Sequence, residues 1–178
     1  MYNELKKNSL NIGLILGGIL ILIASFVYVM DYKLFLDIFL SLVISIIILF
    51  AGTYSAFKTK TINNESITFG NAFKSYFIAV AVGYLIYWIW MFIIYNIVDP
   101  QAAKDIDEQA MLMAKEMFQK LDISKEDINL IMEEMSKSSR FSLSNILQVY
   151  CFKLIGYSLV GLIISLIFFL LYPPKTKN

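Results

Sequence analysis

The sequence contains no histidine and a single cysteine, Cys151, in 178 residues. Disulfide bonds, Cys/His zinc sites and catalysis by a histidine acid or base are therefore excluded. The lack of histidine also excludes a haem held by a histidine ligand and a protease triad built on histidine. Charged residues make up only 16% of the chain, and the net charge of +1 comes with no basic stripe of the kind that binds nucleic acid.

Hydrophobic residues, in contrast, account for 58% of the chain, which is typical of a membrane protein. Four apolar runs are each close to the roughly 20 residues that cross a bilayer as a helix. We expect these spans at about residues 10–30, 38–57, 75–98 and 154–172. The sequence therefore predicts an all-α integral membrane protein with four transmembrane helices, whose first partner is the lipid bilayer.

The first apolar run follows Lys6 and Lys7, as the core of a cleavable signal peptide would. Signal cores are only about 7–15 residues long and end in small residues. This run is longer and ends in large residues around Met30, which favours a retained membrane anchor. Within it, Gly13 and Gly17 have the spacing that lets another helix approach closely.

The C-terminal half of the third run is crowded with aromatic residues: Tyr84, Tyr87, Trp88, Trp90, Phe92 and Tyr95. Tyr and Trp gather at the headgroup level of many spans, so a belt with ordinary packing is the interpretation we favour. The alternative is an aromatic pocket that attracts a cationic ligand to the faces of its rings.

The longest polar segment, residues 99–144, holds ten acidic and six basic residues, a net charge of −4. Asp99 followed by Pro100 is typical of a helix start. Ser124 and Asp127 resemble the capping box of a second helix. Apolar residues recur at spacings of three and four along both helices. The segment is therefore predicted to be an amphipathic helical hairpin between the third and fourth spans.

Three regions follow from these patterns. Residues 1–98 contain the first three spans, residues 99–144 form the hairpin, and residues 145–178 contain the fourth span and a basic tail. The part before the fourth span, up to Lys153, is predicted to be an amphipathic turn. Lys153 then lies near enough to the span's end for its ammonium group to reach the membrane surface.

The distribution of lysine outside the hairpin predicts the orientation. With four spans, three groups of lysines fall on one side of the membrane: Lys6 and Lys7, Lys58, Lys60 and Lys74, and Lys175 and Lys177. Positive residues are enriched on the cytoplasmic side. We therefore expect a multi-pass protein of the cell (inner) membrane with both termini in the cytoplasm and the hairpin outside.

The apolar face of the hairpin is the candidate interaction surface. Its residues are Ile106, Met113, Met117, Leu121, Ile128, Met132 and Met135. Methionine adapts its shape to a partner or fills gaps in a core. We therefore expect a non-catalytic scaffold or interaction protein whose acidic, Met-rich hairpin contacts itself, a second copy or another envelope protein.

Two metals are weighed against this interpretation. Asp122, Ser124, Glu126 and Glu133 match ligand positions of a calcium loop, but Asp127 stands where the loop needs glycine. The hairpin methionines offer thioethers of the kind that select Cu(I), but we favour packing or an adaptable protein-binding surface, because methionine serves both. The acids alternate with lysine, as on a solvated helix surface. We expect no metal, no other cofactor and no enzymatic activity.

Transport is the alternative function. Transport pathways usually leave charges or helix breaks inside the spans, and the four predicted spans have no charge and no proline in the middle. A transporter or channel subunit for a small solute or an ion would then have to form by oligomerisation.

Three stretches resemble a known family. They are Ile67-Thr-Phe-Gly-Asn-Ala-Phe-Lys74 at the entry of the third span, Val98-Asp99-Pro100, and Ile123-Ser-Lys-Glu-Asp-Ile128 with Ile131-Met-Glu-Glu-Met135. They are similar to a bacterial membrane protein family known as domain of unknown function 4199. The resemblance covers the whole chain and implies four spans with a hairpin before the last one. It implies no activity, cofactor or catalytic residue.

Overall fold

The computed structural model describes residues 2–63, 66–121 and 123–174. Within these ranges every regular element is helical. The elements are α1 (Tyr2–Asp31), the 3₁₀ helix η1 (Tyr32–Leu36), α2 (Ile38–Ile62), α3 (Phe69–Ile93), the π-helical turn η2 (Ile94–Val98), α4 (Pro100–Lys120), α5 (Lys125–Ser136) and α6 (Leu143–Leu171). The four helical stretches built on α1, α2, α3 and α6 are each long and apolar enough to cross a membrane. The predicted all-α, four-span membrane class is therefore confirmed.

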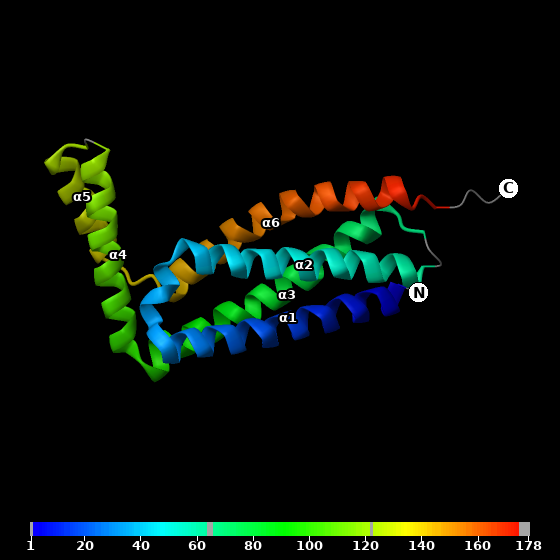
Figure 1. Cartoon of the computed structure of the whole chain (residues 1–178), viewed down its shortest axis with the longest axis horizontal. Coiled ribbons are helices and arrows are strands. Elements are labelled where there is room, and N and C mark those ends of the chain that lie inside the picture. The colour runs from blue at the N-terminus through cyan, green and yellow to red at the C-terminus, as the bar shows by residue number, and fades with distance from the viewer. Residues whose placement is uncertain (1, 64–65, 122, 175–178) are drawn as a thin grey trace.

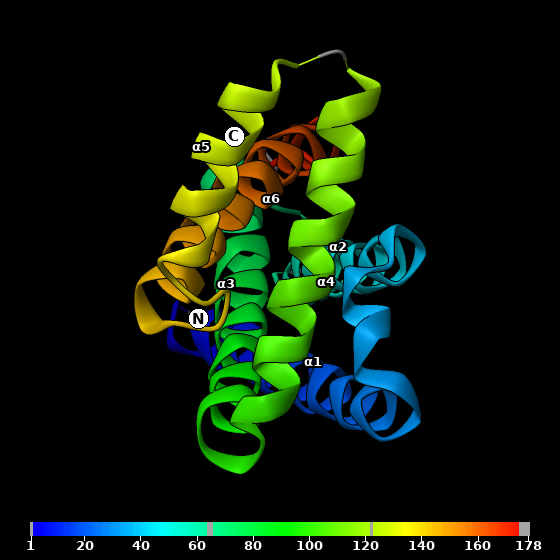
Figure 2. The ribbon, with the colours of Figure 1, turned by 90° about the vertical axis from the view of Figure 1, so that its left-hand side faces the viewer.

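The four long helices form one elongated bundle, with the hairpin of α4 and α5 at one end (Figure 1). Helices α1 and α3 run toward the hairpin, and α2 and α6 run away from it, so α1 begins and α6 ends at the opposite end. Helix α3 packs against each of the other three long helices. Figure 2 looks along the bundle from the hairpin end and shows α4 and α5 lying across it.

Glycines bring α1 and α3 into close contact. A Cβ atom on Gly17 would lie 2.8 Å from Cβ of Ile86, and one on Gly83 would lie 2.6 Å from Cγ of Leu16. Each glycine thus makes room for a large side chain of the facing helix, which is how small residues act in membrane helix pairs. The close approach predicted from the GxxxG spacing of α1 is confirmed.

Tyr76 of α3 fills the middle of the bundle. Its ring lies against Gly52 of α2 and Gly161 of α6, both of which have no side chain to displace it. Its hydroxyl donates a 3.1 Å hydrogen bond to the carbonyl oxygen of Tyr157. The ring is fully buried, so this one residue ties three of the four spans together.

Toward the end away from the hairpin, four hydroxyl side chains meet in the core. The Oγ atom of Ser75 lies 2.7 Å from Oγ of Ser9, 2.8 Å from Oγ of Ser55 and 2.7 Å from Oγ1 of Thr59. All four side chains are buried. Because apolar contacts between helices gain little in lipid, such polar contacts contribute to joining α1, α2 and α3.

The fourth span differs from the prediction at its start. Helix α6 begins at Leu143, where Ser142 caps it by accepting a 3.4 Å hydrogen bond from the backbone N–H of Asn145. The predicted amphipathic turn before Lys153 is therefore the first part of the same helix. At its other end, the predicted tail residues Lys175 and Lys177 lie outside the described residues.

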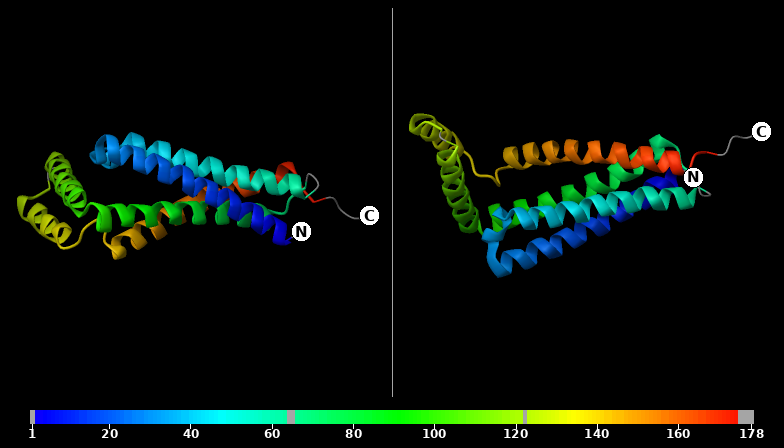
Figure 3. Two further views of the ribbon diagram at one scale, coloured as in Figure 1. Left: turned by 90° about the horizontal axis from the view of Figure 1, so that it is seen from below. Right: turned by 45° about the horizontal axis from the view of Figure 1, so that its top comes forward.

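The hairpin lies crosswise on the end of the bundle, as Figures 1 and 3 show from several sides. Asp99 caps α4 by accepting a 3.0 Å hydrogen bond from the N–H of Ala102. Ser124 caps α5 by accepting a 3.1 Å hydrogen bond from the N–H of Asp127. Both helix starts were predicted from these capping residues.

Candidate functional site

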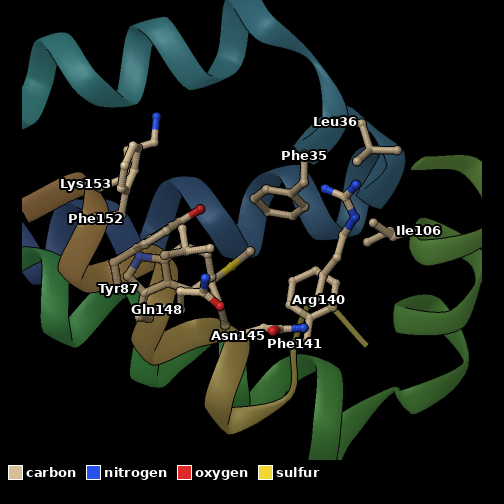
Figure 4. A pocket seen from close by; sticks show the side chains of 13 residues that line it. Phe35, Leu36, Tyr87, Ile106, Arg140, Phe141, Asn145, Gln148, Phe152 and Lys153 are labelled. Carbon is tan, nitrogen blue, oxygen red and sulfur yellow. The ribbon is translucent and has the colours of Figure 1, made fainter. Parts of the chain in front are cut away.

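A cavity of about 600 Å³ opens at the hairpin end of the bundle, among α3, α6 and η1 and next to α4 (Figure 4). Its apolar walls are formed by Phe35, Leu36, Tyr87, Trp88, Met91, Ile106, Phe141, Val149 and Phe152. Four polar side chains complete the lining: Arg140, Asn145, Gln148 and Lys153. We call this cavity the groove. It combines an aromatic interior with cations, which is a common design of a binding site for a partly apolar ligand.

A second cavity adjoins the groove near a contact between α2 and α6. Near the middle of the bundle these helices meet, where the hydroxyl of Tyr157 lies 3.1 Å from Oγ of Ser45. Between this contact and the groove lies a smaller cavity of about 150 Å³, which residues 40, 41, 44 and 45 of α2 help to line. Lys153 and Trp88 line both cavities. The two cavities are therefore neighbours that share part of their lining.

Lys153 is a charged residue inside a membrane-spanning helix. It stands ten residues after Leu143, the first residue of α6, which places it about 15 Å along the helix. The segment before Lys153 is helical, so this lysine stands within α6 and not at its first turn. That its ammonium group reaches the membrane surface stays a prediction. Charged side chains inside spans are costly and usually mark a functional site.

Arg140 is held beside the groove by the segment that returns from α5 to α6. The backbone N–H of Arg140 donates a 3.2 Å hydrogen bond to Oδ1 of Asp107 on α4, and its Nε atom lies 3.9 Å from the same oxygen. The next residue, Phe141, is buried and stacks on Tyr95 with ring centroids 4.0 Å apart. Its carbonyl oxygen accepts a 2.8 Å hydrogen bond from Nδ2 of Asn96. Asp107, which binds Arg140, and the stacked Phe141 next to it therefore fix the position of Arg140.

The electrostatics of the groove favour an anion. The ammonium group of Lys153 and the guanidinium group of Arg140 extend toward α2 and η1 in Figure 4. Asp107 forms an ion pair with the Nε atom of Arg140 at 3.9 Å, and none of the described residues that line the groove is a carboxylate. Two cations with the amides of Asn145 and Gln148 thus offer hydrogen-bond donors to a negatively charged group.

The aromatic residues of the third span have divided roles. Trp90 donates a 3.0 Å hydrogen bond from Nε1 to Oγ of Ser25, and Tyr84 packs on Tyr150 with ring centroids 5.8 Å apart. These rings join helices. Tyr87 and Trp88, in contrast, line the groove. The two cations beside them disfavour the cationic ligand that was the alternative interpretation of the aromatic cluster.

Two tyrosine–carboxylate pairs fasten α4 to the end of the bundle. Tyr28 donates a 2.8 Å hydrogen bond to Oδ2 of Asp99, and Tyr32 donates one of 2.8 Å to Oδ2 of Asp105. The pKa of Asp99 is lowered first by the N–H of Ala102 and then by the hydroxyl of Tyr28. The pKa of Asp105 is lowered first by the hydroxyl of Tyr32 and then by the amide of Gln101. Both pairs therefore hold best with ionised carboxylates.

The seven residues of the predicted interaction face are not together on the surface. Buried or partly buried are Ile106, Ile128, Met132 and Met135. Met113, Met117 and Leu121 are exposed near the far end of α4. Ile106 also reaches the groove. The interaction role of the face stays a prediction, and its distal part is the most exposed.

The calcium and copper alternatives depended on hairpin residues. Asp122 lies outside the described residues, and the Ser124 hydroxyl donates a 2.7 Å hydrogen bond to Oδ2 of Asp127 as part of the α5 cap. In the part of the chain that the structure describes, no group of three or more Cys, Asp or Glu residues is placed to hold a metal ion.

The family model described as "Protein of unknown function (DUF4199)" matches residues 11–169, which include all four spans and the hairpin. The chain belongs to this family. No curated protein and no solved structure matches it. The predicted resemblance is thereby confirmed, and it places the groove of this DUF4199 protein within the matched region.

Of the four polar residues of the groove in this DUF4199 protein, sequence reasoning singled out Lys153 but not the other three. Arg140 stood in a serine-rich return, and Asn145 and Gln148 fell in the segment interpreted as a turn. A signal was present, because Asn145, Gln148 and Phe152 follow the three- and four-residue spacing of one helical face. Extending the fourth helix back to the Ser142 cap would have placed this face, and Lys153, within one helix.

Proposed function

We propose that this DUF4199 protein is a non-catalytic multi-pass membrane protein that binds an anionic amphiphile, such as a negatively charged phospholipid, in the groove. The observation that carries the proposal is Lys153, a cation within the candidate membrane-spanning helix α6, at a ligand-sized cavity that Arg140 also lines. A charged residue inside a span usually has a function, because its burial in lipid is costly. A negatively charged group in the groove would neutralise the charge of Lys153.

The shape of the groove supports an amphiphile over a small soluble anion. Its walls are mainly aromatic, and its volume of about 600 Å³ lies within the range of ligand pockets, about 300–1,000 Å³. Phe152 is exposed on α6, where lipid surrounds the span, and also lines the groove. A headgroup near Lys153 and Arg140 could therefore leave its acyl chains along this lipid-facing side.

The core beyond the groove supports binding at one end over transport through the bundle. Ile48, Tyr76 and Val80 are fully buried and fill the centre between the groove and the opposite end. A single chain with this core offers no continuous polar path through these residues. A transporter formed by oligomerisation remains the competing function, and flux of an anion across proteoliposomes that depends on Lys153 would establish it.

The groove also supports a non-catalytic role. Its titratable side chains are Tyr87, Arg140 and Lys153, and acid–base catalysis usually needs a paired acid and base aimed at a reacting group. Among the described lining residues no carboxylate stands beside Lys153. We therefore propose binding without turnover.

We further propose that the hairpin end faces outward from the cell (inner) membrane and that both termini are cytoplasmic. Lys6, Lys7, Lys58 and Lys74 belong to the bundle end away from the hairpin, as the positive-inside rule expects of the cytoplasmic side. An alkaline phosphatase fusion after Ile123 should be active, and one after Asn63 inactive. An active fusion after Asn63 and an inactive one after Ile123 would show the opposite orientation.

The binding proposal is tested by native mass spectrometry of the detergent-purified protein with added phosphatidylglycerol or phosphatidylcholine. We expect the anionic lipid to be retained more strongly. Lys153→Gln and Arg140→Gln should each weaken its retention about tenfold or more, because a hydrogen bond to a charged group contributes about 1.5–3 kcal/mol. The matched control is Lys58→Gln, an exposed lysine at the other end. Equal retention of both lipids, or an unchanged Lys153→Gln variant, would refute the proposal.

A further inference from the structure

One face of α4 passes from buried to exposed along its length. Ile106 and Ala110 are 1% and 4% exposed and lie against the end of the bundle, where α4 contacts η1 and η2. Met113, Met117 and Leu121 are 50%, 53% and 63% exposed. The change occurs within one helical turn. We call the three exposed residues the distal edge.

The distal edge points in the same direction as the buried residues. From Ile106 to Leu121 the apolar positions follow one another at spacings of four, three, four and four, which keeps them on one side of a helix. Since Ile106 and Ala110 face the bundle, the distal edge faces that way too. It projects beyond the spans that cover the first half of α4.

Helix α5 occupies a different side of α4. The partly buried apolar residues of α4 are Met111, Ala114 and Phe118, and α5 packs on this helix. At about 100° per residue these three lie roughly 80–140° around the helix from Ile106. The hairpin partner therefore leaves the distal edge uncovered.

The orientation of α4 relative to the spans identifies what the distal edge meets. Helix α4 runs across the bundle end in Figures 1 and 3, whereas the four spans run along the bundle. A helix crosswise to membrane spans lies along the membrane surface. The side of α4 that faces the bundle is consequently the side that faces the bilayer.

We propose that the distal edge is a membrane-interface contact, with Met113, Met117 and Leu121 inserted among the lipids next to the bundle. Amphipathic helices in this position bury their apolar face about 5–10 Å into the boundary between headgroups and acyl chains. Methionine side chains are flexible enough to fit between acyl chains. Glu116 and Lys120 flank the edge at the headgroup level, where the lysine stem can extend along the apolar surface.

The continuity of the buried face supports lipid as the occupant. Ala102, Ala103 and Ile106 pack in the apolar core at the bundle end, and the distal edge extends this face where protein gives way to bilayer. The same apolar face of α4 thus contacts protein along its first half and lipid along its second half. This inference does not depend on the proposed ligand of the groove or on which side of the membrane the hairpin occupies.

The test uses single cysteines in a Cys151→Ser background of the full chain, labelled with the environment-sensitive fluorophore NBD. The protein is reconstituted in vesicles of phosphatidylcholine and phosphatidylglycerol, with or without lipids brominated on the acyl chains. The test variants are Met117→Cys and Leu121→Cys. Lys115→Cys, on the opposite side of α4, is the water-facing control, and Leu22→Cys, a lipid-exposed position in α1, is the membrane control.

We expect NBD at Met117→Cys and Leu121→Cys to emit at shorter wavelength than at Lys115→Cys and to be quenched at least twofold by brominated lipid. Quenching at Leu22→Cys confirms correct reconstitution. Emission and quenching equal to those of Lys115→Cys would overturn the proposal in favour of water. Short-wavelength emission without quenching by brominated lipid would also overturn it, and would identify protein, a second copy or another envelope protein, as the cover.

Discussion

The hydroxyl cluster around Ser75 allows the packing of the spans to be tested quantitatively. Ser75→Ala removes one oxygen that lies within 2.8 Å of the hydroxyls of Ser9, Ser55 and Thr59. Ser9 keeps its 2.9 Å hydrogen bond to the carbonyl of Leu5, and Ser55 keeps its 2.9 Å hydrogen bond to the carbonyl of residue 75. The substitution therefore removes hydrogen bonds between helices without opening a large cavity.

The expected decrease in stability follows from these hydrogen bonds. Hydrogen bonds between membrane helices contribute about 0.6 kcal/mol each on average and at most about 1.7 kcal/mol. Ser9 and Ser55 use their own protons on backbone carbonyls, so the Ser75 hydroxyl makes two hydroxyl–hydroxyl hydrogen bonds at a time, one that it donates and one that it accepts from Thr59. Removing both should destabilise the bundle by about 1.2 kcal/mol. At 1.36 kcal/mol per factor of ten, the unfolding equilibrium should shift about eightfold.

Reversible unfolding in mixed micelles of SDS and a mild detergent, followed by circular dichroism, measures this change. The matched control is Ser158→Ala, because the hydroxyl of Ser158 donates a 2.7 Å hydrogen bond only to the carbonyl of Leu154 in its own helix. We expect the control to lie within about 0.5 kcal/mol of the wild type, as surface-like substitutions do. If Ser75→Ala were no more destabilising than Ser158→Ala, the cluster would not join the helices.

Two further predictions concern the hairpin and the glycine contacts. The pKa of Asp99 is lowered from 3.8, so the docking of α4 through Tyr28 should be intact above pH 3.8 and lost as the pH falls through the lowered value. Amide hydrogen exchange of α4, corrected for its intrinsic pH dependence, should then become faster, and Tyr28→Phe should speed it already at neutral pH. An exchange rate that is unchanged in both cases would contradict the docking. Gly83→Ala should destabilise the bundle, because the new Cβ meets the side chain of Leu16, whereas Gly156→Ala should be neutral or stabilising by up to about 1 kcal/mol, because nothing lies within 4 Å of it. Equal thermal midpoints for the two alanine variants would refute the close contact of α1 and α3.

The spans and the hairpin could be predicted from the sequence because their signals are local. Apolar runs long enough to cross a bilayer predict a helix almost by themselves, since backbone groups in lipid must be satisfied within the segment. Asp99 followed by Pro100 and Ser124 before α5 are capping patterns that act within one turn. The structure has both caps.

The groove could not be predicted in the same way, because it depends on where distant segments meet. The fourth apolar run begins after Lys153, so hydropathy alone placed this lysine at the membrane surface. The structure shows α6 starting at Leu143. Arg140 reaches the groove only because Phe141 stacks on Tyr95 and Asp107 holds its backbone N–H, and neither contact has a local sequence signal.

The predicted interaction face of the hairpin contains both buried and exposed residues for a related reason. Helical spacing correctly placed Ile106, Met113, Met117 and Leu121 on one side of α4. Spacing does not tell where a bundle ends beneath a helix, and the change from 1% exposure at Ile106 to 50% at Met113 reflects that edge. Tertiary position therefore decided which residues of the face are accessible.

Photolabelling with phosphatidylglycerol that carries a diazirine on its acyl chain tests the groove most directly. After irradiation in vesicles, peptide mass spectrometry should find adducts enriched on Tyr87, Trp88 and Phe152, and the enrichment should disappear when Lys153 and Arg140 are both replaced by Gln. Phe50 and Leu170, which are exposed to lipid away from the groove, are the control positions. If the wild type carried no more adducts on the groove residues than on these two, the result would contradict an anionic amphiphile site.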